Sequence, residues 1–155
     1  MAAGPLQFLD QRLPELWNAA TDWTTHEIRA ILCDDSQALT TGFAGTSTEA
    51  LYSDLTGELS TGGGYTQGGV LVDNFLATLD TASTHYGKLD ADDISFPGLT
   101  KSSIAYVVLL DFAYSDPLIL GFFELEAGGT VDLTGQDLNV YWNANGLFRI
   151  KRSGE

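Results

Sequence analysis

The chain has a single cysteine, which excludes a disulfide within it. Small secreted domains are commonly held together by paired cysteines, and that pattern is missing here. Cys33 ends the apolar run of residues 28–33. We expect it to be a small hydrophobic residue of the core rather than a reactive thiol.

Long apolar runs are also missing. No stretch approaches the roughly 20 apolar residues that a membrane-spanning helix needs. The first five residues, M-A-A-G-P, have neither the basic start nor the apolar stretch of a secretory signal. We therefore expect a soluble protein that is made in the cytoplasm and does not enter a membrane.

Basic residues are scarce: 7 Lys and Arg stand against 21 Asp and Glu, for a net charge of −14. Nucleic-acid binding needs clustered Lys and Arg, so the composition disfavours a nucleic-acid partner. Between Ala30 and Phe148 there are 16 acidic residues and two basic ones, whereas Arg149, Lys151 and Arg152 cluster near the C-terminal end. Two interpretations stay open: a subunit that docks its basic end and shows an acidic face to solvent, or a generally acidic domain.

Catalytic motifs are absent as well. The sequence contains no G-x-S-x-G, no P-loop and no H-E-x-x-H. His26 and His85 are far apart and stand among hydroxyl residues, so we expect solvated turn histidines rather than a metal pair. Acidic residues are so numerous that some pair fits the spacing of a glycosidase, which makes that signal unspecific. We expect no enzyme and no cofactor.

One acidic turn has the hard oxygen ligands that calcium prefers, at Asp90, Asp92 and Asp93. The EF-hand pattern fails there, because Ser95 stands where Gly is required and Lys101 where the bidentate Glu is required. A solvated turn is the favoured interpretation, and the sequence alone leaves ion binding open.

The 155 residues suit one domain with its own core, and 17 glycines with 11% aromatics favour β structure. Apolar residues at helical spacing, interrupted by Pro14, predict a short helical N-terminal arm over residues 1–22. The spacing of residues 46–49 is that of a capping box and predicts one short helix within a long Thr/Ser/Gly loop.

The remaining pattern predicts a mainly β fold: an antiparallel β-sandwich, jelly-roll-like, of seven to eight strands over residues 23–155. Residues 104–110 are apolar at consecutive positions, which is typical of a central strand covered on both faces. Pro97 and Gly98 are expected to end a strand. The predicted strands are residues 27–33, 70–77, 88–96, 104–110, 118–125, 130–133, 138–142 and 147–151.

Two pairs of adjacent aromatics, Phe122–Phe123 and Tyr141–Trp142, suggest a platform for carbohydrate. Neighbouring residues of a strand point to opposite faces of the sheet. We therefore expect at least one residue of each pair to pack in the core.

Several short motifs follow one another along the chain. The most specific are the G-Y-T-Q-G-G turn of residues 64–69 and the W-N-A-N-G-L-F run of residues 142–148. The others are F-L of 8–9, A-T-D-W of 20–23, I-R-A-I-L of 28–32, E-L-S of 58–60, Y-V-V-L of 106–109, D-P-L-I of 116–119 and V-Y of 140–141. In their order and spacing these motifs resemble a family of small virion structural proteins of tailed bacteriophages and prophages.

The resemblance implies a non-enzymatic, β-rich component of the particle, made in the cytoplasm of the bacterial host. An interior protein facing the packaged genome should be less acidic, which favours a decoration or cement protein on the capsid exterior that binds the major capsid protein. We expect a symmetric homo-oligomer such as a trimer. A tail, collar or fibre-base component and a glycan-binding module are the alternatives.

The partner-docking candidates come from both ends of the chain. An apolar segment near the start of the chain can reach a neighbouring subunit, and a basic segment can meet an acidic one. The candidates are Leu6, Phe8, Leu9, Leu13, Trp17, Arg149, Lys151 and Arg152.

Overall fold

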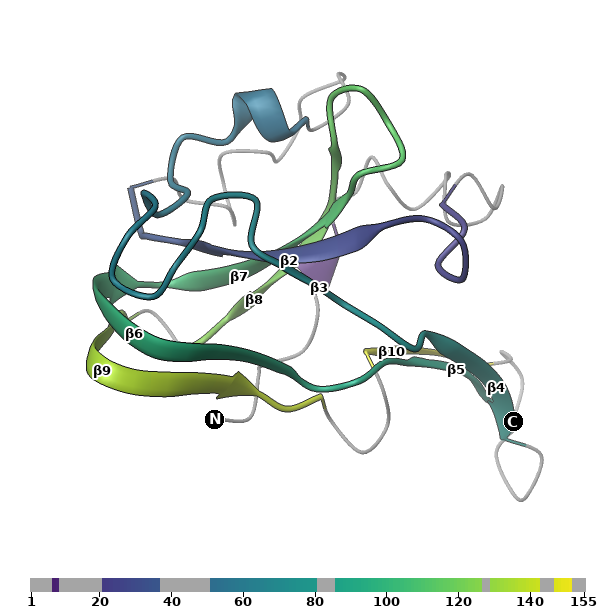
Figure 1. The fold of residues 1–155 in the computed structure, drawn as a ribbon. Helices are drawn as coiled ribbons and strands as arrows, with labels where there is room; N and C mark the ends of the chain where they lie inside the picture. The colour runs from purple at the N-terminus through teal and green to yellow at the C-terminus, as the bar shows by residue number, and fades with distance from the viewer. Residues whose placement is uncertain are drawn as a thin grey trace.

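The computed structural model describes residues 7–8, 21–36, 51–80, 86–126, 129–142 and 147–151. Within them the fold is mainly β, and every pair of neighbouring strands is antiparallel (Figure 1). The predicted mainly β class with antiparallel sheets is confirmed. These ranges contain ten strands rather than seven or eight, for reasons that the individual sheets make clear.

Five strands form the larger sheet. In spatial order they are β1 (Gln7–Phe8), β8 (Leu118–Glu124), β7 (Tyr106–Asp111), β2 (Ile28–Cys33) and β3 (Val70–Leu71). β7 is the central strand, as the sequence predicts, and its side chains from Val107 to Leu110 are fully buried. A strand with both faces covered needs apolar residues at every position, which explains the missing alternation.

A second layer is formed by β6 (Ile94–Ile104) and β9 (Val131–Val140), which lie below the larger sheet in Figure 1. Alternate residues of both layers meet in one apolar cluster, for example Leu109 of β7 and Phe96 of β6. Burying such side chains contributes about 2 kcal/mol each. The two layers are therefore arranged like a sandwich.

The expectation that Pro97 and Gly98 end a strand is wrong. β6 runs through both residues, because a register shift between Phe96 and Leu99 takes the proline out of the regular ladder. Gly98 has φ 59°, and its N–H donates to Asp137 Oδ1 at 2.8 Å. The bulge replaces a lost ladder bond with a carboxylate acceptor.

The predicted strands 130–133 and 138–142 belong to one strand, β9, although Gly135 has φ 65° at its middle. Its N–H donates to Thr100 Oγ1 at 3.0 Å, so the ladder continues across the irregularity.

A third sheet, of three short strands and called the small sheet below, lies beside the two layers (Figure 1). Its order is β10 (Phe148–Lys151), β5 (Tyr86–Asp90) and β4 (Leu76–Asp80). Two predicted strands split here: residues 70–77 divide between β3 and β4, and residues 88–96 divide between β5 and β6. The breaks at residues 72–75 and 91–93 pass the chain from one sheet to another, which periodicity along the sequence does not reveal.

The larger sheet has an apolar cluster on each face. Val108, Ile119 and Phe122 belong to the cluster on the side away from β6 and β9, and Tyr52 and Leu55 pack against it. Both Phe122 and Phe123 are therefore buried, whereas Tyr141 is 48% exposed beside the buried Trp142. The expectation that one residue of each pair packs in the core is confirmed, and the first pair has no exposed ring.

Cys33 is 1% exposed in that second cluster. Burial raises the pKa of its thiol well above the ordinary value, and the nearby carboxylates of Glu58 and Asp34 raise it further. The prediction that Cys33 is a small buried residue of the core is confirmed.

The helical expectations need correction. Gln7 and Phe8 form β1 and pair with β8, so the predicted N-terminal helix is wrong for these two residues. In the predicted long loop the described helical segment is the single 3₁₀ turn η2 (Tyr52–Asp54). Residues 46–49 lie outside the described ranges. No helix in the described part of the chain is long or apolar enough to cross a membrane.

Candidate functional site

The G-Y-T-Q-G-G turn surrounds the carboxylate of Glu58. The Tyr65 hydroxyl and the Gly68 N–H both donate to Glu58 Oε1, each at 2.7 Å, and the Tyr52 hydroxyl donates to Oε2. Tyr65 also accepts the Leu32 N–H of β2 at 3.2 Å. The motif therefore connects a loop to the middle of the larger sheet.

The glycines of this turn allow close approach to both layers. A Cβ on Gly64 would lie 2.6 Å from the Gly98 carbonyl oxygen of β6, and one on Gly69 would lie 2.0 Å from the Ala30 oxygen of β2. Both residues have positive φ. Only glycine fits such positions without strain, so these glycines let the turn pack closely on both layers.

The environments of Tyr65 and Tyr52 predict that the folded protein loses stability at alkaline pH. Burial raises the pKa of Tyr65, and the hydrogen bond to Glu58 raises it further; the same causes act on Tyr52. A raised folded-state pKa gives stability that is complete below the unfolded pKa, near 10, and is lost as pH rises above it. Urea denaturation from about pH 9 to about pH 11 should show a smaller fall in the free energy of unfolding for Tyr65→Phe than for wild type. Tyr141→Phe, which changes an exposed side chain, should fall as wild type does; an equal fall for Tyr65→Phe would contradict this account.

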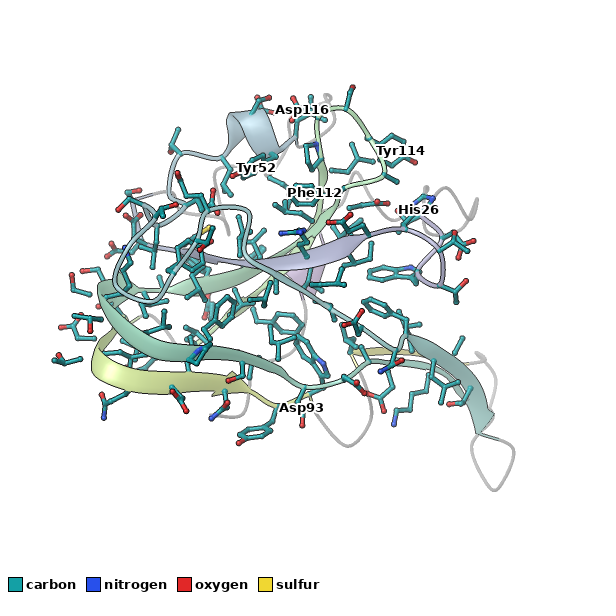
Figure 2. All side chains as sticks on the ribbon, viewed as in Figure 1. His26, Tyr52, Asp93, Phe112, Tyr114 and Asp116 are labelled. Carbon is teal, nitrogen blue, oxygen red and sulfur yellow. The ribbon has the colours of Figure 1, made fainter. Side chains whose placement is uncertain are left out.

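His26 is not the solvated turn histidine that the sequence predicts. Its Nδ1 lies 2.8 Å from Oδ2 of Asp111, a carboxylate that is 0% exposed. Asp111 also accepts the Ala113 N–H at 2.9 Å, and the Tyr114 ring lies edge-on to the imidazole at 6.1 Å. Figure 2 shows His26, Phe112 and Tyr114 together near the start of β2. His85 lies outside the described residues.

An open pocket of about 710 Å³ lies beside this histidine. One wall is the loop from Trp23 into β2, as far as Arg29, and the other is the segment from Leu71 to Phe75 that leaves β3. Its volume lies within the range of small-molecule sites. Seven of its eleven lining residues are polar or charged, which distinguishes it from a lipid pocket.

Hydrogen bonds hold both walls in place. In the first wall, the N–H groups of Thr25 and His26 donate to the Asp22 carbonyl oxygen. Hydrogen bonds from Thr24 and Thr25 lower the pKa of the Asp22 carboxyl to about 2. In the second wall, Asn74 has φ 57° and donates from Nδ2 to Asp92 Oδ2 at 2.6 Å. Left-handed backbone at a residue other than glycine is uncommon and is often found at binding sites.

The candidate calcium ligands have separate protein partners. Asp90 pairs with Lys88 at 2.6 Å, and Asp92 accepts from Asn74. Asp93, labelled in Figure 2 far from His26, accepts the Trp142 N–H at 2.9 Å. Among the described residues, no group of three or more His, Cys, Asp or Glu could hold a metal ion.

Many carboxylates of this acidic chain have a structural role as hydrogen-bond acceptors. Many accept a hydrogen bond from a backbone N–H in a turn or bulge, where no ladder partner exists. These acceptors are Asp22, Asp34, Asp54, Glu58, Asp90, Asp93, Asp111, Asp116, Asp132 and Asp137. Many of the acidic side chains therefore provide hydrogen-bond acceptors for backbone N–H groups that have no partner in a strand ladder.

Most docking candidates lie outside the described residues: Leu6, Leu9, Leu13, Trp17 and Arg152. Phe8 pairs through its backbone with Gly121 of β8, at the edge of the larger sheet. Arg149 and Lys151 are in β10, at register positions opposite Lys88 and Tyr86. Of the candidates that the structure describes, Phe8 thus belongs to the larger sheet, whereas Arg149 and Lys151 belong to another.

The pocket is the feature that sequence reasoning misses. Its walls are far apart in the sequence and contain no catalytic or ligand-binding motif. Trp23 and the T-T-H turn after it are a weak signal, since aromatic and hydroxyl residues are as frequent in structural turns. Comparison of the chain with protein-family models, curated proteins and solved structures finds no match.

Proposed function

We propose that the chain is a structural protein of a tailed-bacteriophage virion: a decoration or cement protein that binds the major capsid protein and stabilises the shell. The observation that supports it most is the charge asymmetry. The small sheet that lies beside the acidic sandwich contains three of the seven basic residues, Lys88, Arg149 and Lys151, against two acidic ones, Asp80 and Asp90 (Figure 1). This sheet is the end that would face an acidic surface of the capsid.

The mechanism is adhesion without chemistry. Each copy binds through apolar contacts and hydrogen bonds of modest strength, and many copies on one lattice convert that strength into avidity. A symmetric homo-oligomer, such as a trimer, would bridge several capsid subunits. The acidic sandwich then points outward, away from the packaged genome, and the protein reaches the capsid from the host cytoplasm.

Neutralising the small sheet tests the docking surface. Arg149→Gln with Lys151→Gln should lower the occupancy of purified particles by about tenfold at physiological salt, because charged pairs across an interface are lost. Occupancy is measured by gel densitometry after sedimentation. The matched control is Thr134→Glu with Gln136→Glu on β9, which changes the net charge equally at exposed positions. Equal occupancy of the two variants would contradict docking through this sheet.

A reconstruction of the particle decides the location. Density for the chain on the outer capsid surface supports the proposal. Density confined to the tail, collar or fibre base overturns it and favours the alternative virion role.

A further inference from the structure

We propose that the pocket between the loop before β2 and the segment after β3 binds a neutral saccharide. The inference goes beyond capsid docking and does not depend on it, because the pocket uses none of the residues of the small sheet. Three properties of the pocket support this inference. It has an aromatic surface and hydrogen-bond acceptors that face solvent, and its arginine already donates hydrogen bonds to other groups of the protein.

The aromatic surface comes from Trp23 and Phe75, whose ring centroids are 5.4 Å apart at 55°. Both rings are half-buried and pack on the main core, so they are fixed in orientation. A pyranose ring has apolar C–H faces that pack on such rings, while its hydroxyls need polar partners around them. The pocket places polar side chains around the rings.

Acceptors face the pocket from both walls. Within the described chain, the exposed Asp73 carboxylate has no hydrogen-bond or ion-pair partner of its own. The imidazole of His26 is held through Nδ1 by the buried Asp111, which leaves Nε2 as the ring atom available to a ligand. Sugar hydroxyls donate to acceptors of both kinds.

Among the described residues that line the pocket, Arg29 is the only Lys or Arg. Its Nε donates to Glu27 at 2.6 Å, and its Nη1 donates to the carbonyls of Gly68 and Gly69 at 3.2 and 3.4 Å. Its guanidinium carbon also lies 5.4 Å from the centre of the Phe112 ring. Because Glu27 and Asp73 also line the pocket, an anionic sugar or a phosphate would be repelled.

One exposed apolar side chain lines the pocket, and two more belong to residues next to its walls. Leu71 lines it, Leu76 follows the lining residue Phe75 in the sequence, and the Tyr114 ring lies 6.1 Å from the His26 ring. Exposed apolar side chains at a pocket are consistent with a binding surface. An extended peptide would bind by adding to a sheet edge. The β3 edge offers only two residues for that, which favours the saccharide.

The experiment screens the full-length protein on an array of neutral, sialylated and sulfated oligosaccharides. We expect binding to at least one neutral glycan and to none that needs its acidic group. Titration calorimetry with the strongest neutral binder then compares the variants Trp23→Ala and Asp73→Asn with wild type. Each should weaken binding by about tenfold or more, since each loses a stacking or hydrogen-bonding partner.

Two matched controls separate the pocket from general surface effects. Tyr141→Ala removes an exposed aromatic ring on the other layer, and Asp35→Asn removes an exposed carboxylate outside the pocket. Both should bind as wild type does. Asp73→Asn changes an exposed side chain and should not affect folding. It therefore still tests the pocket if the Trp23→Ala variant does not fold.

Several outcomes overturn the inference. They are no binding to any neutral glycan, binding to anionic glycans alone, and unchanged affinity in Asp73→Asn. Binding of a peptide library in place of the array would reassign the pocket to a protein partner. None of these results alters the occupancy test on the particle, so the two proposals fail separately.

Discussion

Glu58→Ala is expected to lower the free energy of unfolding by about 3 kcal/mol, because its carboxylate accepts three hydrogen bonds, two from the turn of residues 64–69 and one from Tyr52 of η2. The largest part comes from Tyr65, which is 3% exposed. Without Glu58 its hydroxyl proton has no acceptor, and an unsatisfied buried donor costs about 1–3 kcal/mol. The remainder comes from the Tyr52 hydroxyl and the Gly68 N–H.

Urea denaturation measures this loss of stability, and two further variants serve as comparisons. Glu58→Gln keeps one oxygen acceptor and should lose about half as much, since the amide cannot accept at both positions. Glu126→Ala, which removes an exposed carboxylate, should stay within about 0.5 kcal/mol of wild type. If Glu58→Ala were as stable as Glu126→Ala, the carboxylate would not be holding the turn to the sheet.

The central strands are predictable from the sequence because their chemistry is local. Every residue from Val107 to Leu110 is apolar, and a strand with that pattern must be covered on both faces. The turn at residues 114–117 and the partner strand β8 follow for the same reason. In these segments propensity, patterning and turn residues agree, and the prediction is correct.

Strand ends in the layer of β6 and β9 are less predictable, because residues distant in the sequence supply the hydrogen bonds that a proline or glycine interrupts. Pro97 and Gly98 would end an isolated strand, yet Asp137 accepts the Gly98 N–H from the facing strand and β6 continues. The reverse occurs at residues 72–75, where an apolar run is divided between two sheets. A distant carboxylate or a change of sheet leaves no periodic signal in the sequence.

The pocket and the His26–Asp111 pair escape prediction for a related reason. Asp111 ends an apolar strand, where an acidic residue usually marks the return to solvent. In the structure it is 0% exposed, and β2, antiparallel to β7, brings His26 back to it. A carboxylate is stable at such depth only with partners, and those partners lie on other segments of the chain.

Gly69→Ala should be the most destabilising of the glycine changes in the turn beside β2, with a loss of about 4 kcal/mol. Two effects add: Gly69 has φ 65°, and the new Cβ would lie 2.0 Å from the Ala30 oxygen. Left-handed backbone costs alanine about 1 kcal/mol. The steric overlap accounts for the rest, because β2 is held between β3 and β7 and cannot move away.

Gly135→Ala separates the two effects. Gly135 also has φ 65°, but no atom lies within 4 Å of the position of its Cβ. It therefore carries the backbone cost alone, about 1 kcal/mol, and the difference between the two variants in urea denaturation measures the close approach to β2. Equal losses would mean that backbone conformation explains both positions. A larger loss at Gly69 would show that the turn is glycine-rich because it packs on a strand, and Arg29, anchored to the Gly68 and Gly69 carbonyls, extends that packing to the pocket.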